Sequence, residues 1–413
     1  MDFRKILRYF VTCIKWLVLA VVVGALVGPC AGAFGVALRW ANDTRTGYPW
    51  LIFFLPLGGV VIVWLYQAAH NRDGGSTNAV FTAVQDKVLM PLSTAPLIFI
   101  STVLTHLLGG SAGREGAALQ LGGAISGQLG RRLKMDADDC RVMTMCGMSA
   151  AFAALFGTPL AATVFTLEVV SVGTMYYASL VPCMLSALMG VGVANLIGLE
   201  PTSFLVEAIL PVTVQSVLQV VALAALTGVL SIAFCQLLHV APKLYARFIP
   251  NAYLRAAVGG VLVVALTLAV KNMDYNGAGE HVIHAAVAGS AVPWAFLLKM
   301  LFTALTLGAG FKGGEIVPLF FTGATFGCAV APLLGLPASF GAAVGLVTMF
   351  CGATNTPLAS IFLAAEIFRG RNLTLFALAC AVSYVCSGYF SLYSKQQFVF
   401  SKLTAELRKD DVE

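Results

Sequence analysis

Charged side chains are scarce in this chain of 413 residues, because Asp, Glu, Lys and Arg together supply only 11% of it. A soluble domain usually carries about 25% charged residues. Hydrophobic residues reach 59%, and the net charge is +6. So few charges cannot cover a water-exposed surface of this size. The composition therefore excludes a soluble enzyme, a nucleic-acid-binding protein and a disordered chain, and it predicts an integral membrane protein.

Patterns that bind metals are also missing. The ten cysteines lie mostly inside apolar stretches without the spacing of a metal site, and we interpret them as small core residues. Of the five histidines only His281 and His284 lie at helical spacing, without a ligand set around them. The zinc motif His-Glu-x-x-His does not occur. We therefore expect no enzymatic activity, and a membrane-embedded enzyme is the weakest of the hypotheses considered.

Basic residues gather at the two ends of the chain. Residues 1–12 combine Arg4, Lys5 and Arg8 with aromatic and aliphatic side chains, which predicts a short amphipathic helix lying on the membrane surface. Four more bases lie near the other end: Lys395, Lys402, Arg408 and Lys409. Because cytoplasmic segments carry the excess of Lys and Arg, both termini are predicted to be cytoplasmic, with an even number of crossings between them.

Glycine and proline interrupt most of the apolar segments, and the chain contains 41 glycines and 16 prolines. A clean crossing needs about 20 apolar residues. Residues 51–65, 177–197, 214–238 and 373–392 come close to this, whereas the other segments are short or broken. Broken helices persist at membrane depth only where they line a cavity or are buried in protein. The pattern therefore predicts an all-α, polytopic membrane protein of tilted, broken helices.

Two motifs occur twice, about 200 residues apart. Gly113-Arg114-Glu115 is followed by Leu119, Gly123 and Gly127, and Gly313-Gly314-Glu315 is followed at the same spacing by Leu319, Gly323 and Gly327. A Thr-Pro-Leu-Ala segment also precedes a glutamate in each half, at Glu168 and at Glu366. Broken helices at matching places in two halves mark the binding site of a transporter. The alternative is that these are unrelated Gly-rich packing motifs.

The repeats predict the division of the chain. Residues 13–198 form a first inverted repeat, residues 199–212 a linker, residues 213–392 a second inverted repeat, and residues 393–413 a cytoplasmic tail. In both halves the repeated glutamate opens a helix, where free N–H groups and the helix dipole attract anions. Glu115 and Glu315 could then face one pathway and carry protons beside an anion. Alternatively, Glu115 only caps its helix, and Glu315 is a buried acid paired with Lys312.

These motifs resemble the CLC family of anion channels and proton-coupled anion exchangers. The resemblance rests on residues 113–116, on the two Pro-Leu-Ala segments with their glutamates, and on residues 314–318. It implies a homodimer in the lipid bilayer with a separate pathway in each subunit, and two inverted halves. The family's gating glutamate corresponds to Glu115, and its central tyrosine to Tyr393.

Departures from the usual family pattern narrow the resemblance. Residues 75–79 read Gly-Ser-Thr-Asn-Ala, without the proline found in chloride-handling members. Ile316 replaces a phenylalanine, Val169 stands at the place of an internal proton glutamate, and Glu315 precedes the second anion motif. Together these features resemble the fluoride-exporting branch, proton-coupled antiporters that protect bacteria from fluoride. The resemblance thus implies fluoride and protons as partners, and a bacterial cytoplasmic membrane as the location.

The resemblance also implies a set of anion-binding residues. Small, strongly hydrated fluoride needs close N–H and O–H donors and the positive edges of aromatic rings. The predicted set is Ser76, Thr77, Asn78, Phe81, Gly113, Arg114, Gly116, Ala117, Gly314, Ile316 and Phe321. Phenylalanines in apolar helices usually belong to the core, so core packing is the alternative for both. A structural sodium ion held by backbone carbonyls is expected near Val317, Gly277 and Gly279.

The sequence therefore predicts a fluoride/proton antiporter. In this prediction Glu115 alternately occupies the anion path and carries a proton, and Glu315 supplies the internal proton step. The resemblance implies that Tyr393 narrows the inner side. Glu168 and Glu366 are expected to stabilise contacts between helices rather than to move protons. The alternative within the family is a chloride or nitrate channel, or a chloride/proton exchanger.

Overall fold

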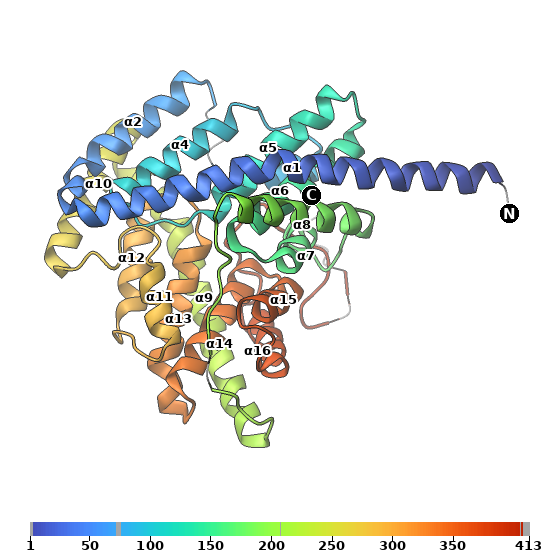
Figure 1. Cartoon of the computed structure of the whole chain (residues 1–413). Coiled ribbons are helices and arrows are strands. Elements are labelled where there is room, and N and C mark those ends of the chain that lie inside the picture. Colours follow the sequence, from blue (N-terminus) through green and yellow to red (C-terminus); the bar gives the residue numbers. More distant parts are fainter. Residues whose placement is uncertain (1–2, 72–75, 207, 405, 408–413) are drawn as a thin grey trace.

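The fold is described from a computed structural model, which describes residues 3–71, 76–206, 208–404 and 406–407 (Figure 1). Most of these residues are helical, as predicted. Gly75, Arg408 and Lys409 lie outside the described residues, as does the rest of the predicted tail beyond residue 407.

Helices follow one another along the described chain, and the longest connection between them is residues 197–213. The first half contains α1 (Phe3–Gly47), η1 (Pro49–Phe54), α2 (Leu55–Ala68), α3 (Asn78–Gln85), α4 (Thr94–Leu107), α5 (Glu115–Arg132), α6 (Ala137–Phe156), α7 (Pro159–Glu168), β1 (Ser171–Val172), η2 (Tyr177–Ser179) and α8 (Leu180–Leu196). The second half contains α9 (Val214–Phe248), α10 (Ala252–Val270), α11 (Glu280–Val287), α12 (Ala295–Gly308), α13 (Ile316–Val330), η3 (Ala331–Leu334), α14 (Ala338–Thr354), α15 (Pro357–Ile367), α16 (Leu373–Cys386) and β2 (Gln397–Phe398). The two strands pair in parallel and tie the chain after α16 to the end of α7.

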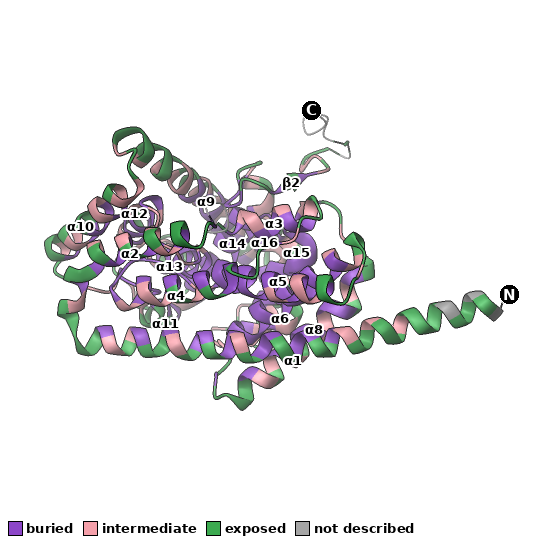
Figure 2. Cartoon of the chain, turned by 90° about the horizontal axis from the view of Figure 1, so that it is seen from above, coloured by how far each residue is buried: buried purple, intermediate pink, exposed green. Residues whose placement is uncertain are grey.

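Among the described residues, seven helices are long and apolar enough to cross a membrane, and shorter apolar helices accompany them. The apolar window of α6 is 89% buried inside the protein, whereas that of α1 is only 22% buried. Figure 2 shows the buried residues concentrated around α5, α6 and α14, with many exposed residues along α1. Apolar side chains on the outer helices can face lipid. The helical conformation pairs the backbone N–H and C=O groups within each helix, which lipid cannot do.

The predicted separate helix over residues 1–12 is wrong for the described part of that range. Residues 3–12 are the first turns of α1, which continues without interruption to Gly47. The range 3–12 contains neither glycine nor proline, so nothing ends the helix there. The predicted boundary at residues 199–212 stays a prediction. Its described residues form no helix, and Phe204 donates its N–H to the Ile367 carbonyl oxygen at 2.9 Å.

The two halves repeat the same packing. An added Cβ on Gly122 of α5 would lie 2.1 Å from the carbonyl oxygen of Gly147 on α6, and one on Gly323 of α13 would lie 2.3 Å from that of Gly345 on α14. Only glycine permits such close helix approach. Thr158, directly before α7, and Thr356, directly before α15, also share one backbone conformation, with φ, ψ of −121°, 75° and −122°, 74°. The repeated sequence motifs therefore fold alike.

Glu168 and Glu366 join the two halves reciprocally. Glu168, at the end of α7, accepts N–H groups of Leu358 and Ala359 at 3.2 and 2.9 Å, in the first turn of α15. Glu366, near the end of α15, accepts N–H groups of Leu160 and Ala161 in the first turn of α7, both at 2.9 Å. Each carboxylate thus caps the helix that carries the other. The predicted interhelical role of these glutamates is confirmed.

Removing one of these caps is expected to destabilise the fold. In Glu168→Ala the N–H groups of Leu358 and the buried Ala359 lose their acceptor, which costs about 1–3 kcal/mol for a buried group left unsatisfied. Glu168 is buried at 5% exposure, whereas Glu366 is half-buried, so Glu366→Ala should cost less. Thermal unfolding of both variants in detergent measures this order. Equal melting temperatures for Glu168→Ala and the unmodified protein would contradict it.

Candidate transport site

The two Gly-Glu motifs meet at the centre of the protein. The Gly113 N–H donates to the Gly314 carbonyl oxygen at 2.6 Å, and the Gly314 N–H donates to the Gly113 carbonyl oxygen at 2.7 Å. These residues directly precede α5 and α13, so the first turns of both helices converge on one place. Free N–H groups and two helix dipoles make this place favourable for an anion.

Glu115 places its carboxyl group at this convergence. The side chain is fully buried, and Oε2 accepts the N–H groups of Arg114 at 3.1 Å and Val317 at 3.3 Å. Its donors thus come from the first turns of two helices in different halves. Oε1 is buried without a hydrogen-bond partner among the described residues. A half-satisfied carboxylate at main-chain N–H groups stands where a small anion could bind instead.

Glu315 lies on the other side of the glycine bridge. Its carboxylate oxygen Oε2 is 3.5 Å from the Thr77 hydroxyl, and the residue lines a cavity of about 460 Å³. We name this space the Glu315 cavity. It is lined by Ser76, Thr77, Asn78, Leu238, His239, Pro242, Lys243, Leu307, Gly310, Phe311, Lys312, Gly313, Glu315, Leu392 and Ser394. Three predicted anion residues, at positions 76–78, therefore face the same space as Glu315.

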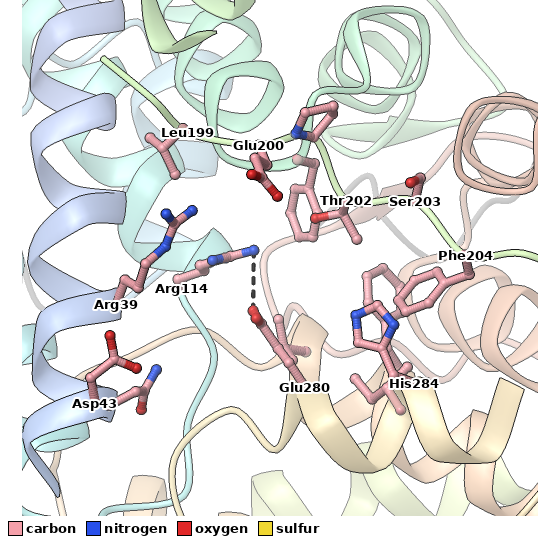
Figure 3. A pocket seen from close by; sticks show the side chains of 16 residues that line it. Arg39, Asp43, Arg114, Leu199, Glu200, Thr202, Ser203, Phe204, Glu280 and His284 are labelled. Atoms are coloured by element: carbon pink, nitrogen blue, oxygen red, sulfur yellow. Dashed lines mark ion pairs between the residues drawn. The ribbon is translucent and has the colours of Figure 1, made fainter. Parts of the chain in front are cut away.

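A second cavity of about 380 Å³ opens near Arg114 (Figure 3). We name it the Arg114 cavity; Arg39, Glu200, Glu280, Val317 and eleven further residues line it with Arg114. Arg114 reaches across the space to Glu280, with Nη2 and Oε1 3.1 Å apart. The two cavities share no lining residue in the described chain. Arg114 and Val317, the residues that hold Glu115, line one cavity, and Glu315 lines the other.

The main chain between the two glutamate side chains contains two glycines, Gly116 and Gly314, which have no side chain. An added Cβ on Gly116 would lie 2.4 Å from the Thr77 hydroxyl and 3.1 Å from the Glu315 carboxylate. One on Gly314 would lie 2.7 Å from the Glu115 nitrogen and 2.9 Å from its carboxylate. Small residues here let the main chain approach both carboxyl groups and an anion between them.

Gly314→Ala is expected to lower transport strongly. A methyl group within 2.7 Å of the Glu115 backbone nitrogen must push the two loops apart. A displacement of about 1 Å in a reactive site can cost about 100-fold in rate. Ion flux in liposomes measures the loss. Gly192→Ala is the matched control, because nothing lies within 4 Å of its added Cβ; equal rates for the two variants would contradict the expectation.

Tyr393 and Phe81 pack beside the Glu315 cavity. Their ring centroids are 4.6 Å apart in an edge-to-face arrangement, and both residues are buried. The Tyr393 hydroxyl is buried and has no hydrogen-bond partner among the described residues. Its chain neighbours Leu392 and Ser394 line the cavity. Neither ring lines the Glu315 cavity or the Arg114 cavity, and the narrowing role of Tyr393 stays a prediction.

Other predicted residues are less closely associated with the site. Phe321 is fully buried, and its ring contacts Tyr275 and Lys299 rather than either cavity. Ala117 and Ile316 are fully buried in the first turns of α5 and α13. Ser111 belongs to a Gly-x-Ser-x-Gly run at residues 109–113, but its hydroxyl hydrogen-bonds Thr303 at 3.0 Å instead of a histidine. The run therefore lacks the partner that a nucleophilic serine needs.

One of the expected sodium ligands, the Gly277 carbonyl oxygen, already accepts a cationic side chain of this protein. The Gly277 carbonyl oxygen accepts Lys299 Nζ at 2.7 Å, and Arg45 Nη1 is 2.2 Å from an added Cβ on Gly277. Two cations thus already surround Gly277. Lys299 was missed in the sequence, although it is the one charge in the apolar segment 295–308.

Comparison with known proteins relates the whole chain to one family. The sequence profile described as voltage gated chloride channel matches residues 58–388. The chain is 37% identical over 409 residues to the chloride/fluoride channel protein of Pseudomonas syringae pv. tomato, covering 96% of this chain and 90% of that protein. It is 23% identical over 399 residues to the voltage-gated ClC-type chloride channel of Salmonella typhimurium, covering 90% and 95%.

Solved structures resemble the fold closely. A CLC-type fluoride/proton antiporter superposes with a TM-score of 0.90 and 34% identity, covering 94% of this chain and 98% of that chain. A slow cyanobacterial Cl⁻/H⁺ antiporter superposes with a TM-score of 0.76 and 20% identity, covering 90% and 94%, which relates the fold alone. The predicted all-α architecture of inverted halves is confirmed at this level.

Proposed function

The chain belongs to the voltage gated chloride channel family, and on that premise we propose that it exports fluoride in exchange for protons. One observation carries the proposal: two glutamates from equivalent places in the halves flank the same glycine bridge, and a different cavity opens beside each. A passive channel needs no second acid there. The similarity to a solved fluoride/proton antiporter supports the same activity.

The Glu115 carboxylate acts as a removable anion. While it is charged, it accepts the N–H groups of Arg114 and Val317 and occupies the anion position. When it gains a proton, it loses the charge that holds it at the two helix ends, and an anion takes its place. The proton and the anion thus alternate at one position, which couples their movements.

Glu315 passes protons between the Glu315 cavity and Glu115. It lines that cavity, and an added Cβ on Gly116 would lie 3.1 Å from its carboxylate. Val169, at the place of another internal acid, has no ionisable side chain, but its carbonyl oxygen accepts Gln396 Nε2 at 2.8 Å. Thr77, Ser76 and Asn78 offer hydroxyl and amide donors that can replace water around a small anion leaving or entering the cavity.

Assembly and orientation complete the proposal. We infer a homodimer with one pathway in each subunit, in a bacterial cytoplasmic membrane, with both termini on the cytoplasmic side. The bases near both ends support this orientation. Light scattering of the detergent-solubilised protein measures the number of copies, and a monomer would overturn the dimer.

Flux measurements in liposomes test the function. Purified protein is reconstituted, a fluoride gradient is imposed without a pH gradient, and fluoride and pH are recorded together. Antiport predicts proton movement opposite to fluoride, and little proton movement with chloride. Fluoride or chloride flux without protons would instead indicate a channel, and proton-coupled chloride flux a chloride/proton exchanger.

A further inference from the structure

A buried lysine lies next to the segment that contacts the loop before Glu115. Lys299 on α12 is 0% exposed, and its Nζ donates to the carbonyl oxygens of Gly277 at 2.7 Å and Tyr275 at 3.1 Å. The centroid of the Phe321 ring lies 5.1 Å from the same nitrogen. Two main-chain carbonyls and an aromatic face thus surround the ammonium group.

No carboxylate compensates this charge directly. Of the ion pairs found among the described residues, none involves Lys299. A buried charge is costly unless polar groups satisfy it. Main-chain carbonyl oxygens are also the ligands that proteins offer to hard cations. The break at residues 273–279 therefore has the chemistry of a cation site, and a side chain of this protein fills it.

The filled site is connected to the loop that carries Glu115. Gly277 donates its N–H to the Gly110 carbonyl oxygen at 3.0 Å, and Asn276 Nδ2 donates to that of Gly109 at 2.7 Å. The helix of Lys299 also holds this loop, because the Ser111 N–H donates to Thr306 Oγ1 at 3.0 Å. The loop 109–114 runs directly into α5. Lys299 thus holds the segment 273–279, and that segment holds the loop 109–114 by hydrogen bonds.

The position of the Phe321 ring depends on the same break at residues 273–279. Gly279 has a φ of +73°, and an added Cβ there would lie 2.8 Å from two ring atoms. The ring therefore packs against Gly279 and against the Lys299 ammonium. A cation on one face of an aromatic ring is attracted by its quadrupole and holds the ring in place.

We propose that the ammonium group of Lys299 is a covalently attached structural cation, which holds the loops 273–279 and 109–114 together and positions Glu115. The protein then requires no free sodium at these carbonyls. Lys299 is a positioning residue, because it reaches Glu115 only through the two loops. The transport readout of this proposal rests on the proposed function, whereas its unfolding readout does not.

Cation rescue tests the proposal. The full-length protein and Lys299→Ala are heated in detergent in sulfate salts of sodium, methylammonium or N-methylglucamine. The unmodified protein should melt at one temperature in all three salts. Lys299→Ala should melt lower in N-methylglucamine and recover in methylammonium or sodium, which can enter the vacated carbonyl site. Sodium-dependent melting of the unmodified protein, or a Lys299→Ala loss that neither small cation restores, would overturn the proposal.

Transport provides the second readout. Lys299→Met should lower fluoride-driven proton flux about 100-fold, the scale of a misplaced reactive group. Lys15→Met is the matched control, because Lys15 is an exposed residue whose ion pair with Asp139 lies outside both cavities. A Lys299→Met rate equal to the unmodified rate would also overturn the proposal. If the unmodified protein moves no protons with fluoride, the proposed function fails, and the melting experiment still decides the role of Lys299.

Discussion

Glu115→Gln is expected to abolish fluoride-driven proton movement. Glutamine keeps the size of the side chain and can still accept the N–H groups of Arg114 and Val317, but it carries neither a charge nor an exchangeable acid proton. A positioned proton carrier contributes about 100- to 10,000-fold to such a step, so the coupled flux should fall below detection. Simultaneous recording of fluoride and pH in liposomes measures both fluxes.

Glu115→Ala separates two roles of the Glu115 side chain, which are to block the anion position and to carry a proton. Glu115→Ala leaves the Arg114 and Val317 N–H groups without their carboxylate, so an anion can stay there without competition. We expect no proton coupling in Glu115→Ala, with any remaining fluoride flux passive. Glu406→Gln is the control, because Glu406 is exposed near the end of the described chain. Proton-coupled fluoride flux in either Glu115 variant would exclude this role.

Glu315→Gln is expected to have the second largest effect, on proton flux rather than on anion binding. Glu315 faces its cavity and lies 3.5 Å from the Thr77 hydroxyl, whereas the Glu115 donors come from Arg114 and Val317. Loss of its acid proton should therefore interrupt the internal proton step and leave the anion position intact. Exchange should fall by about 100-fold or more, as for loss of a positioned acid.

Binding and flux measurements together test this assignment. Calorimetric titration of fluoride should give similar affinities for the unmodified protein and Glu315→Gln, while the liposome assay shows the loss of exchange. Fluoride/proton exchange at the unmodified rate in Glu315→Gln would make the assignment wrong. Loss of fluoride binding would instead place Glu315 in the anion site.

Much of the architecture could be predicted from local patterns. Apolar content and the scarcity of charge required a membrane protein, and glycine and proline required broken helices. The spacing shared by residues 113–127 and 313–327 predicted that Glu115 and Glu315 would occupy equivalent places, and the structure brings their loops into hydrogen-bonding contact. The shared Pro-to-Glu spacing likewise predicted the interhelical contacts of Glu168 and Glu366.

Boundaries and long-range neighbours were harder to predict. The amphipathic composition of residues 1–12 suggested a separate helix, but composition alone does not end a helix, and α1 continues through it. Phe321 was included in the anion-binding set because of the resemblance to the family, and that role stays a prediction. Its contacts with Lys299 and Tyr275 could not be predicted, because they depend on how distant helices pack.

The amino-acid sequence by itself determined the membrane environment, the broken helices and the two equivalent halves, because hydropathy, glycine and proline act within a few residues of their own position. Only the tertiary structure decided which carbonyl oxygens meet the Lys299 ammonium and which N–H groups meet the Glu115 carboxylate. Val317 is 202 residues from Glu115 in the chain. Such contacts depend on how helices from both halves pack, and no local pattern of residues encodes that arrangement.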